Sequence, residues 1–405
     1  MAKKIDITNA LFDSELNDYC RKFIIKGEFP ITEKDVREKP ARYQNIKAKI
    51  FEDFILNEKI NYKVYGENIP LAVLVNELGL YNVESLIETQ SLSFTLWTAG
   101  VGYIASPVPG ALPLISSRHN STVHSDPEES IITGLSVLRR NKLKAGEQRV
   151  LLRKLRDNYL DIPVGLEQNC VFMTISALES GKLSRLGIDL AEKKLTDLST
   201  EDKKTLGKAA EELFNFKYLV SKRIRATATD NVSAILDESF SRIDKAQIFQ
   251  QISNIENFPD LRTTFIEMGL PMNDIIRLRN DRHAKKFRKW LCEAEGISSA
   301  DEISKYYLDS ISNAKGFFDS FMGKSTKSII MMAASGLTAS KVATPLGREL
   351  GAISGLGVLA LQPALDYTLD MVDEYLISEL TKGWTPRMFF KKINNHAEKY
   401  KISLD

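Results

Sequence analysis

The chain has 405 residues, of which 43% are hydrophobic and 27% charged, and its formal net charge is +2. These values are typical of a globular protein and argue against a largely disordered or fibrous chain. At roughly 100–200 residues per domain, we expect two or three domains, each able to bury a core. The start of the chain has no apolar run, and the cysteines are far apart, at Cys20, Cys170 and Cys292. We therefore expect a cytoplasmic protein with reduced thiols.

Residues 1–125 predict a small α+β N-terminal domain. A helix is expected over residues 9–27, because a basic turn precedes a glycine at its end, and Pro40 is a candidate start for a second helix. Alternating apolar residues predict short strands at 60–64 and 92–96. Two short helices are expected between these strands.

Residues 89–117 contain no charged side chain, a length that would suit a membrane-spanning helix. Prolines and glycines interrupt the second half of this segment, and either residue type would break such a helix. The sequence therefore favours a buried strand followed by a proline-rich loop.

Residues 126–296 predict a basic helical domain. Asp126 is expected to cap a helix that begins at Pro127, and Ser199 with Asp202 has the spacing of a capping box. Residues 136–226 have more bases than acids, whereas the flanking segments have slightly more acids. This asymmetry bears on possible partners of the chain and not on its fold.

The first candidate binding segment is residues 137–156, which hold many bases and a single acid, Glu147. The bases are Arg139, Arg140, Lys142, Lys144, Arg149, Arg153, Lys154 and Arg156. Such a density of bases suits the phosphates of a nucleic acid, an anionic membrane surface or an acidic protein. The alternative is a solvated helix face that lies over a core.

The second candidate segment is a predicted amphipathic helix over residues 274–296, with Phe287 on its apolar stripe. Its bases are Arg277, Arg279, Arg282, Lys285, Lys286, Arg288 and Lys289. We select Arg282, Lys286 and Lys289 as candidates for binding an anion. A competing interpretation is that the acidic segment 363–380 docks on these bases within the fold.

Residues 297–405 predict a C-terminal helical module. Gly347, Gly351 and Gly355 recur at every fourth residue, so they share one helix face on which another helix can pack closely. This is the spacing of a glycine zipper. An alternative is that residues 328–365 insert into a membrane, although Lys341, Arg348 and Glu349 interrupt the apolar runs.

Motifs for chemistry are weak in this sequence. The run 323–326 has the end of a phosphate-binding loop, but Phe318 stands where its first glycine belongs. His119, His124 and Asp126 have no standard metal-site spacing. A helix-turn-helix at 69–89 is unconvincing because its second helix is acidic. We predict no metal, no cofactor and no catalytic residue, and no small-molecule substrate is identifiable.

The sequence thus predicts a mainly α, multi-helical protein with a small α+β N-terminal domain and a Gly-rich C-terminal helical module. We expect a non-enzymatic interaction protein that associates with itself or with another protein through its helices. The first alternative is a nucleic-acid-binding protein that uses bases in 137–156 and 277–289. The second is a membrane-active effector that uses residues 328–365. An enzyme with residues drawn from distant helices is also compatible with the sequence.

Overall fold

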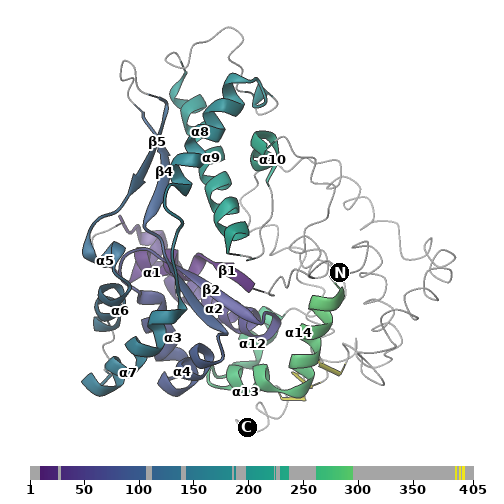
Figure 1. Cartoon of the computed structure of the whole chain (residues 1–405). Coiled ribbons are helices and arrows are strands. Elements are labelled where there is room, and N and C mark those ends of the chain that lie inside the picture. The colour runs from purple at the N-terminus through teal and green to yellow at the C-terminus, as the bar shows by residue number, and fades with distance from the viewer. Residues whose placement is uncertain are drawn as a thin grey trace, which may run out of the picture. The chain divides into compact units, whose positions relative to one another are not determined.

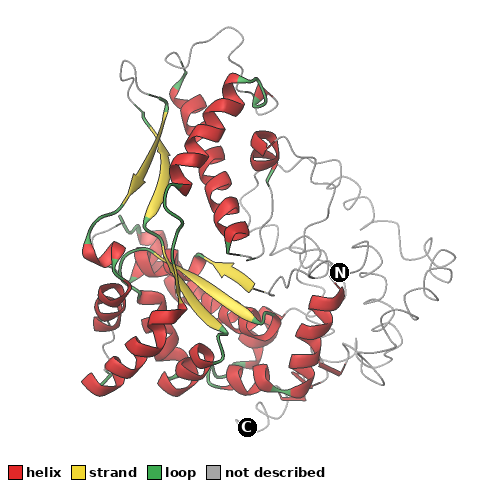
Figure 2. Cartoon of the chain, viewed as in Figure 1, coloured by secondary structure: helices red, strands yellow, loops and turns green. Residues whose placement is uncertain are grey.

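The structure is a computed structural model in which helices predominate and short strands accompany them (Figures 1 and 2). It describes residues 10–25, 29–105, 112–137, 143–184, 187, 198–222, 224, 229–236, 261–294, 388, 389, 392, 393, 395 and 396. The chain forms two compact units. Unit 1 comprises Met1–Ile46 and Asn57–Ala246, and unit 2 comprises Lys47–Leu56 and Gln247–Asp405.

A parallel sheet lies at the centre of unit 1. Its strands are β1 (Ala10–Asp13), β2 (Lys59–Val64), β3 (Leu92–Leu96) and β6 (Tyr159–Leu160), in the order β1-β2-β3-β6. The predicted strands at 60–64 and 92–96 are confirmed. Parallel strands need crossover connections, and helices supply them here, as expected for an α/β unit.

One face of the sheet carries large buried side chains. Tyr62 and Phe94 lie on neighbouring strands with ring centroids 6.3 Å apart, and Phe94 stacks on Tyr159 at 5.7 Å. The helices of this part of unit 1 are α1 (Glu15–Phe23), α3 (Ile69–Leu78), α4 (Leu80–Glu88), α5 (Thr122–Ser125), α6 (Pro127–Ser136) and α7 (Ala145–Leu155), followed by a 3-10 turn, Arg156–Asn158.

The opposite face of the sheet carries a buried polar network. The Tyr218 hydroxyl lies 2.5 Å from the Thr95 hydroxyl, which donates to the Asn61 side-chain oxygen at 2.6 Å. Tyr218 belongs to α9 (Thr200–Ser221), which packs with α8 (Leu166–Glu179) and α10 (Asp230–Leu236). The network satisfies groups that would otherwise be costly to bury and fixes α9 against the sheet.

The uncharged segment 89–117 differs from its prediction. After β3, the chain forms an antiparallel pair, β4 (Ala99–Tyr103) and β5 (Leu114–Arg118), instead of continuing as a loop. The pair packs on α8 and α9 (Figure 1), so apolar residues from it join the core of those helices. Ala99 and Leu114 are the buried residues that the pair contributes to this core.

Three helix predictions need correction, although the expected pair of short helices between β2 and β3 is confirmed as α3 and α4. The helix expected from residue 9 begins at Glu15, because residues 10–13 form β1. Pro40 lies inside α2 (Glu33–Leu56) and does not begin it, since Thr32 and Asp35 form an earlier capping box. The helix predicted over 274–296 is broken at Asp281.

Unit 2 contains residues 47–56 of α2 together with α12 (Leu261–Met268), α13 (Asp274–Asn280) and α14 (Arg282–Ala294). Aromatic pairs build its core. Phe51 stacks on Phe265 with centroids 5.0 Å apart, and Phe287 stacks on Phe389 at 4.3 Å. Gly269, Leu270 and Pro271 lie between α12 and α13.

The domain boundaries at residues 125 and 296 stay a prediction, as does the C-terminal module, which lies mostly outside the described residues. Strand β6 follows residue 125 and pairs with β3, which precedes it. Among the residues that the structure describes, no helix combines the length and apolar character needed to cross a membrane.

Candidate functional site

The break between α13 and α14 creates the N-terminus of a basic helix. The Asp281 carboxylate accepts a hydrogen bond from the backbone N–H of His283 at 2.8 Å, so Asp281 acts as the N-cap of α14. On the inner side of α14, Ala284 and Phe287 are buried in the core of unit 2. The first turns of α14 therefore have a fixed inner face and an outer face that is open to ligands.

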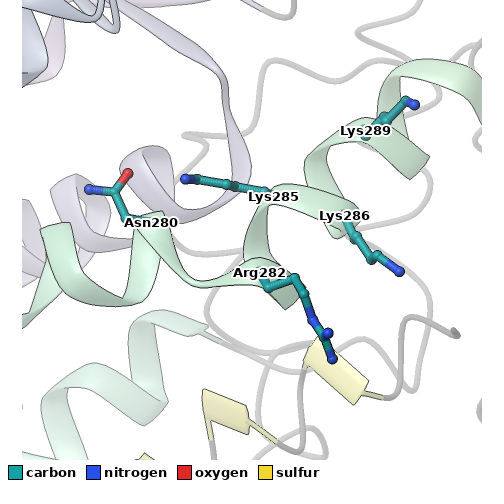
Figure 3. Close-up of a pocket in the computed structure, with 5 residues that line it drawn as sticks. All are labelled: Asn280, Arg282, Lys285, Lys286 and Lys289. Atoms are coloured by element: carbon teal, nitrogen blue, oxygen red, sulfur yellow. The ribbon is translucent and has the colours of Figure 1, made fainter.

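The outer face carries a group of cations that we name the α14 cluster, namely Arg282, Lys285, Lys286 and Lys289. Together with Asn280, the cluster lines an open hollow of about 390 Å³. In Figure 3, Lys285 extends toward Asn280, and Arg282 and Lys286 project together from successive turns. Three members of the cluster are residues that the sequence predicts as anion-binding candidates.

The position of these cations opposes the helix dipole. The first turn of α14 contains no acidic residue, while Arg282 and Lys285 place positive charge at the positive end of the helix. Each such charge typically costs about 0.3–1 kcal/mol. Among the described residues, no carboxylate pairs with Arg282, Lys285 or Lys286 to offset this cost. A bound anion would remove the conflict, because it would be attracted by both the cations and the helix N-terminus.

Two described acids near the α14 cluster, Asp281 and Asp274, already have partners. Asp281 caps α14 and lies 3.5 Å from the Lys392 ammonium group. Asp274 accepts from His396 at 2.9 Å and from Arg277 at 3.2 Å. Arg277, one of the bases of the predicted helix, is therefore engaged in an ion pair.

His283 lies beside the cluster, in the first turn of α14. Burial lowers the pKa of His283, and repulsion from Arg282, Lys392 and Lys286 lowers it further, although Asp281 opposes the effect. The imidazole is thus held toward its neutral form, and a bound anion would favour the protonated form.

Two arginines that the sequence groups with these bases have a structural role instead. Arg279 and Arg288 are buried, with exposed fractions of 4% and 5%. Arg279 donates to the carbonyl of Phe54, and Arg288 donates to the carbonyl of Ile55 at 2.9 Å. These carbonyls belong to the last turn of α2, where backbone acceptors have no partner within the helix. Both arginines therefore cap α2 and are not surface ligands.

The first predicted basic segment is only partly described. Arg139, Arg140 and Lys142 lie outside the described residues, whereas Lys144, Arg149, Arg153 and Arg156 are exposed. Lys154 is paired with Glu84 at 3.3 Å and with Glu88 at 2.8 Å, and these hydrogen bonds, that of Glu88 first, raise its pKa. The acids of α4, Glu84 and Glu88, thus pair with Lys154 of α7.

A third cluster, of aromatic and histidine side chains, follows β2. The Tyr65 hydroxyl lies 2.9 Å from His119 Nε2, and the Tyr65 ring packs edge-on against His119 and His124. Asp126 is the N-cap of α6, as predicted, and accepts from the backbone N–H of Glu128 at 2.9 Å. Within the described residues, no group of three or more His, Cys, Asp or Glu side chains is arranged to hold a metal.

The described cysteines are poor nucleophiles. Burial raises the pKa of Cys20 well above its usual range and raises the pKa of Cys170 to about 11. Both thiols are therefore protonated near neutral pH, and only a thiolate attacks efficiently.

Several predicted features cannot be placed. The glycines Gly347, Gly351 and Gly355, the segment 328–365 and the acidic segment 363–380 lie outside the described residues. Packing or self-association through the glycines, membrane insertion and the docking of the acidic segment all stay predictions.

The sequence reasoning missed residues that are brought together only by parallel strand pairing. Arg21 in α1 and Tyr65 after β2 are adjacent in the structure, and the Arg21 guanidinium lies 5.2 Å from the centroid of the Tyr65 ring. A strand at residues 10–13 is the feature from which this contact could have been predicted, because it places α1 at the carboxyl end of the sheet.

Comparison of the chain with protein-family profiles, with curated protein sequences and with solved structures gives no match.

Proposed function

We propose that this protein binds the phosphate backbone of a nucleic acid through the α14 cluster. The observation that carries the proposal is that Arg282, Lys285 and Lys286, at the start of α14, are exposed or half-exposed and have no carboxylate partner among the described residues. Such bases cost stability in the free protein, so an anionic ligand is the simplest account of their position.

The side chains of the α14 cluster favour binding to backbone phosphates that does not depend on nucleotide sequence. Lysine and arginine side chains neutralise backbone phosphates, and a row of such contacts gives strong but nonspecific attraction. Arg149, Arg153 and Arg156 add a second exposed row on α7 and the turn after it, with spacing that places Arg149 and Arg153 on one helix face. Each row by itself offers several adjacent bases, which suits a chain of phosphates better than a single small anion.

The test measures binding across a range of salt concentrations. Fluorescence anisotropy of a labelled 20-base duplex and of its single strand gives the affinity of the full chain at each concentration. Loss of three phosphate contacts in Arg282→Gln/Lys285→Gln/Lys286→Gln should reduce the slope of log K against log salt by about 2–3 for the duplex.

Arg277→Gln is the matched control, because Arg277 lies on the neighbouring helix and is already paired with Asp274. We expect this variant to retain the slope of the unsubstituted chain. A slope that is flat in the unsubstituted chain, or equal in both variants, would reject a phosphate-binding role for the α14 cluster. Tight binding of acidic peptides with no binding of oligonucleotides would favour a protein partner instead.

A further inference from the structure

Unit 1 contains a pocket at the carboxyl ends of β1 and β2, which shares Tyr65 with the histidine cluster. We name it the sheet-end pocket; it has a volume of about 430 Å³, within the usual range of about 300–1,000 Å³ for small-molecule sites. Its lining residues are Asn17, Asp18, Arg21, Lys22, Phe29, Lys63 and Tyr65. In α/β sheets, ligands characteristically bind beyond the carboxyl ends of the strands, and the lining residues Asn17 and Tyr65 follow the ends of β1 and β2.

Arg21 is fixed in place before any ligand arrives. Its guanidinium donates to the Tyr65 carbonyl at 2.8 Å and to the Glu67 carboxylate at 2.5 Å, and its side chain is only 11% exposed. The Asn17 side-chain oxygen accepts from the Tyr65 backbone N–H at 3.1 Å. Helix α1 and the end of β2 are therefore tied together around the pocket, so that the geometry of its polar groups is preorganised.

The pocket has an excess of positive charge in its lining. Asp18 is its one acidic lining residue, against Arg21, Lys22 and Lys63. Arg21 pairs with Glu67 and Lys22 pairs with Asp35 at 2.9 Å, but neither acid lines the pocket. Among the described residues, Lys63 has no carboxylate partner, and its ammonium group lies 4.8 Å from the centroid of the Trp97 ring. Lys63 is therefore the cation that is most available to an incoming anion.

The same pocket offers aromatic surface. Phe29 lines the pocket and is 49% exposed, so its ring is accessible to a ligand. The Tyr65 ring forms a second aromatic wall. Aromatic side chains of this kind stack on planar rings, and stacking on a base is worth about 1–3 kcal/mol in nucleic-acid-binding proteins.

A ligand that satisfies both features has a negative group and a planar ring. We propose that the sheet-end pocket binds a nucleoside phosphate, with the phosphate at Lys63 and Arg21 and the base against Phe29. This inference is independent of the proposed function, because it uses other residues in the other unit of the chain.

Isothermal titration of the full chain with nucleoside monophosphates tests the proposal, with the free nucleosides and inorganic phosphate as separate ligands. The titrations use the Arg282→Gln/Lys286→Gln background, so that anion binding to the α14 cluster does not contribute. At least one monophosphate should bind about tenfold or more tightly than both its nucleoside and inorganic phosphate. A monophosphate that binds no more tightly than inorganic phosphate would overturn the proposal.

Two substitutions separate the contributions within the pocket. Lys63→Gln should lower the affinity for the monophosphate about tenfold. Lys59→Gln, at the opposite end of the same strand, should leave this affinity unchanged. Phe29→Ala should lower the affinity for the monophosphate to that for inorganic phosphate. Equal affinities in the two lysine variants, each with an unchanged circular dichroism spectrum, would remove Lys63 from the site and with it the proposal.

The histidines provide a location test, because the chain contains only four. His119 contacts Tyr65 in the wall of the pocket, so its ring signals in nuclear magnetic resonance spectra should move on addition of the monophosphate. Signals of His396 in unit 2 should not move. Movement at His283 or His396 without movement at His119 would place the ligand elsewhere and overturn the assignment.

Discussion

The α14 cluster and the sheet-end pocket present their cations in opposite ways. In the sheet-end pocket, Arg21 and Lys22 are held by carboxylates outside the lining, and aromatic rings complete the walls. In the α14 cluster, Arg282 and Lys285 are exposed, without a carboxylate partner among the described residues. If both proposals hold, paired cations beside rings, with Lys63 as the unpaired one, would accept a small ligand of defined shape, whereas the exposed cations of α14 would accept a polyanion. Local pairing would then matter more than the number of bases in setting what each site selects.

The largest expected effect comes from comparing two bases on α14, the buried Arg288 and the exposed Lys285. Arg288→Met should lower the free energy of unfolding by about 2–4 kcal/mol, because the Ile55 and Arg279 carbonyls lose charged donors. Lys285→Gln should change it by no more than about 0.5 kcal/mol. Urea unfolding followed by circular dichroism measures both. Equal effects would mean that the division into structural and ligand-facing bases is wrong.

A second test concerns the backbone that shapes the sheet-end region. Gly66 has φ +73°, and an added Cβ would lie 3.0 Å from His124 Nε2 and 3.4 Å from Arg21 Nη1. Gly66→Ala should therefore destabilise the chain by about 1–2 kcal/mol, since a side chain is strained in this conformation. The variant should also bind the nucleoside monophosphate more weakly, because Arg21 would move. Oligonucleotide binding through α14 should stay unchanged.

Gly146→Ala is the control for Gly66→Ala. Gly146 lies in α7, where an added Cβ meets no atom within 4 Å. Alanine favours a helix over glycine by up to about 1 kcal/mol, so this variant should be as stable as the unsubstituted chain or more stable. Thermal melts of the two variants give the comparison, and a destabilised Gly146→Ala chain would show that the loss is not specific to Gly66.

The sequence predicted elements whose signals are local. Alternation of apolar residues over 60–64 and 92–96 marks β2 and β3, and the side-chain caps at Asp126 and Ser199 mark two helix starts. The apolar face of α14 was recognisable for the same reason, because its period is contained within a few turns. Each of these features is encoded by residues that are neighbours in the sequence.

The features that the sequence did not predict depend on distant partners. Strand β1 has only four residues and β6 only two, so neither can establish a period, and each forms by pairing with a strand far away. Arg279 and Arg288 look like the other bases of their segment, since the α2 carbonyls that bury them are more than 200 positions away. The sheet-end pocket was missed because α1 and β2 meet only through the parallel sheet.

The last prediction uses His283 to connect the α14 cluster to its ligand. Because the folded pKa of His283 lies below the unfolded value of 6.5, its protonation costs stability, and this cost grows as pH falls below 6.5. A phosphate near Arg282 and Lys286 would offset their repulsion and raise the pKa of His283. By linkage, the ligand must then bind more tightly at lower pH, by less than tenfold for a shift of less than one unit.

Histidine signals followed by nuclear magnetic resonance from pH 5 to pH 8, with and without the oligonucleotide, measure this shift directly. His396 is the internal comparison, since it lies in the same unit and donates to the Asp274 carboxylate. In His283→Asn, the affinity for the oligonucleotide should lose the part of its pH dependence that is centred near the pKa of His283. If the pKa of His283 stays fixed while the oligonucleotide binds, the phosphates do not reach the start of α14. Arg149, Arg153 and Arg156 would then be the next residues to substitute.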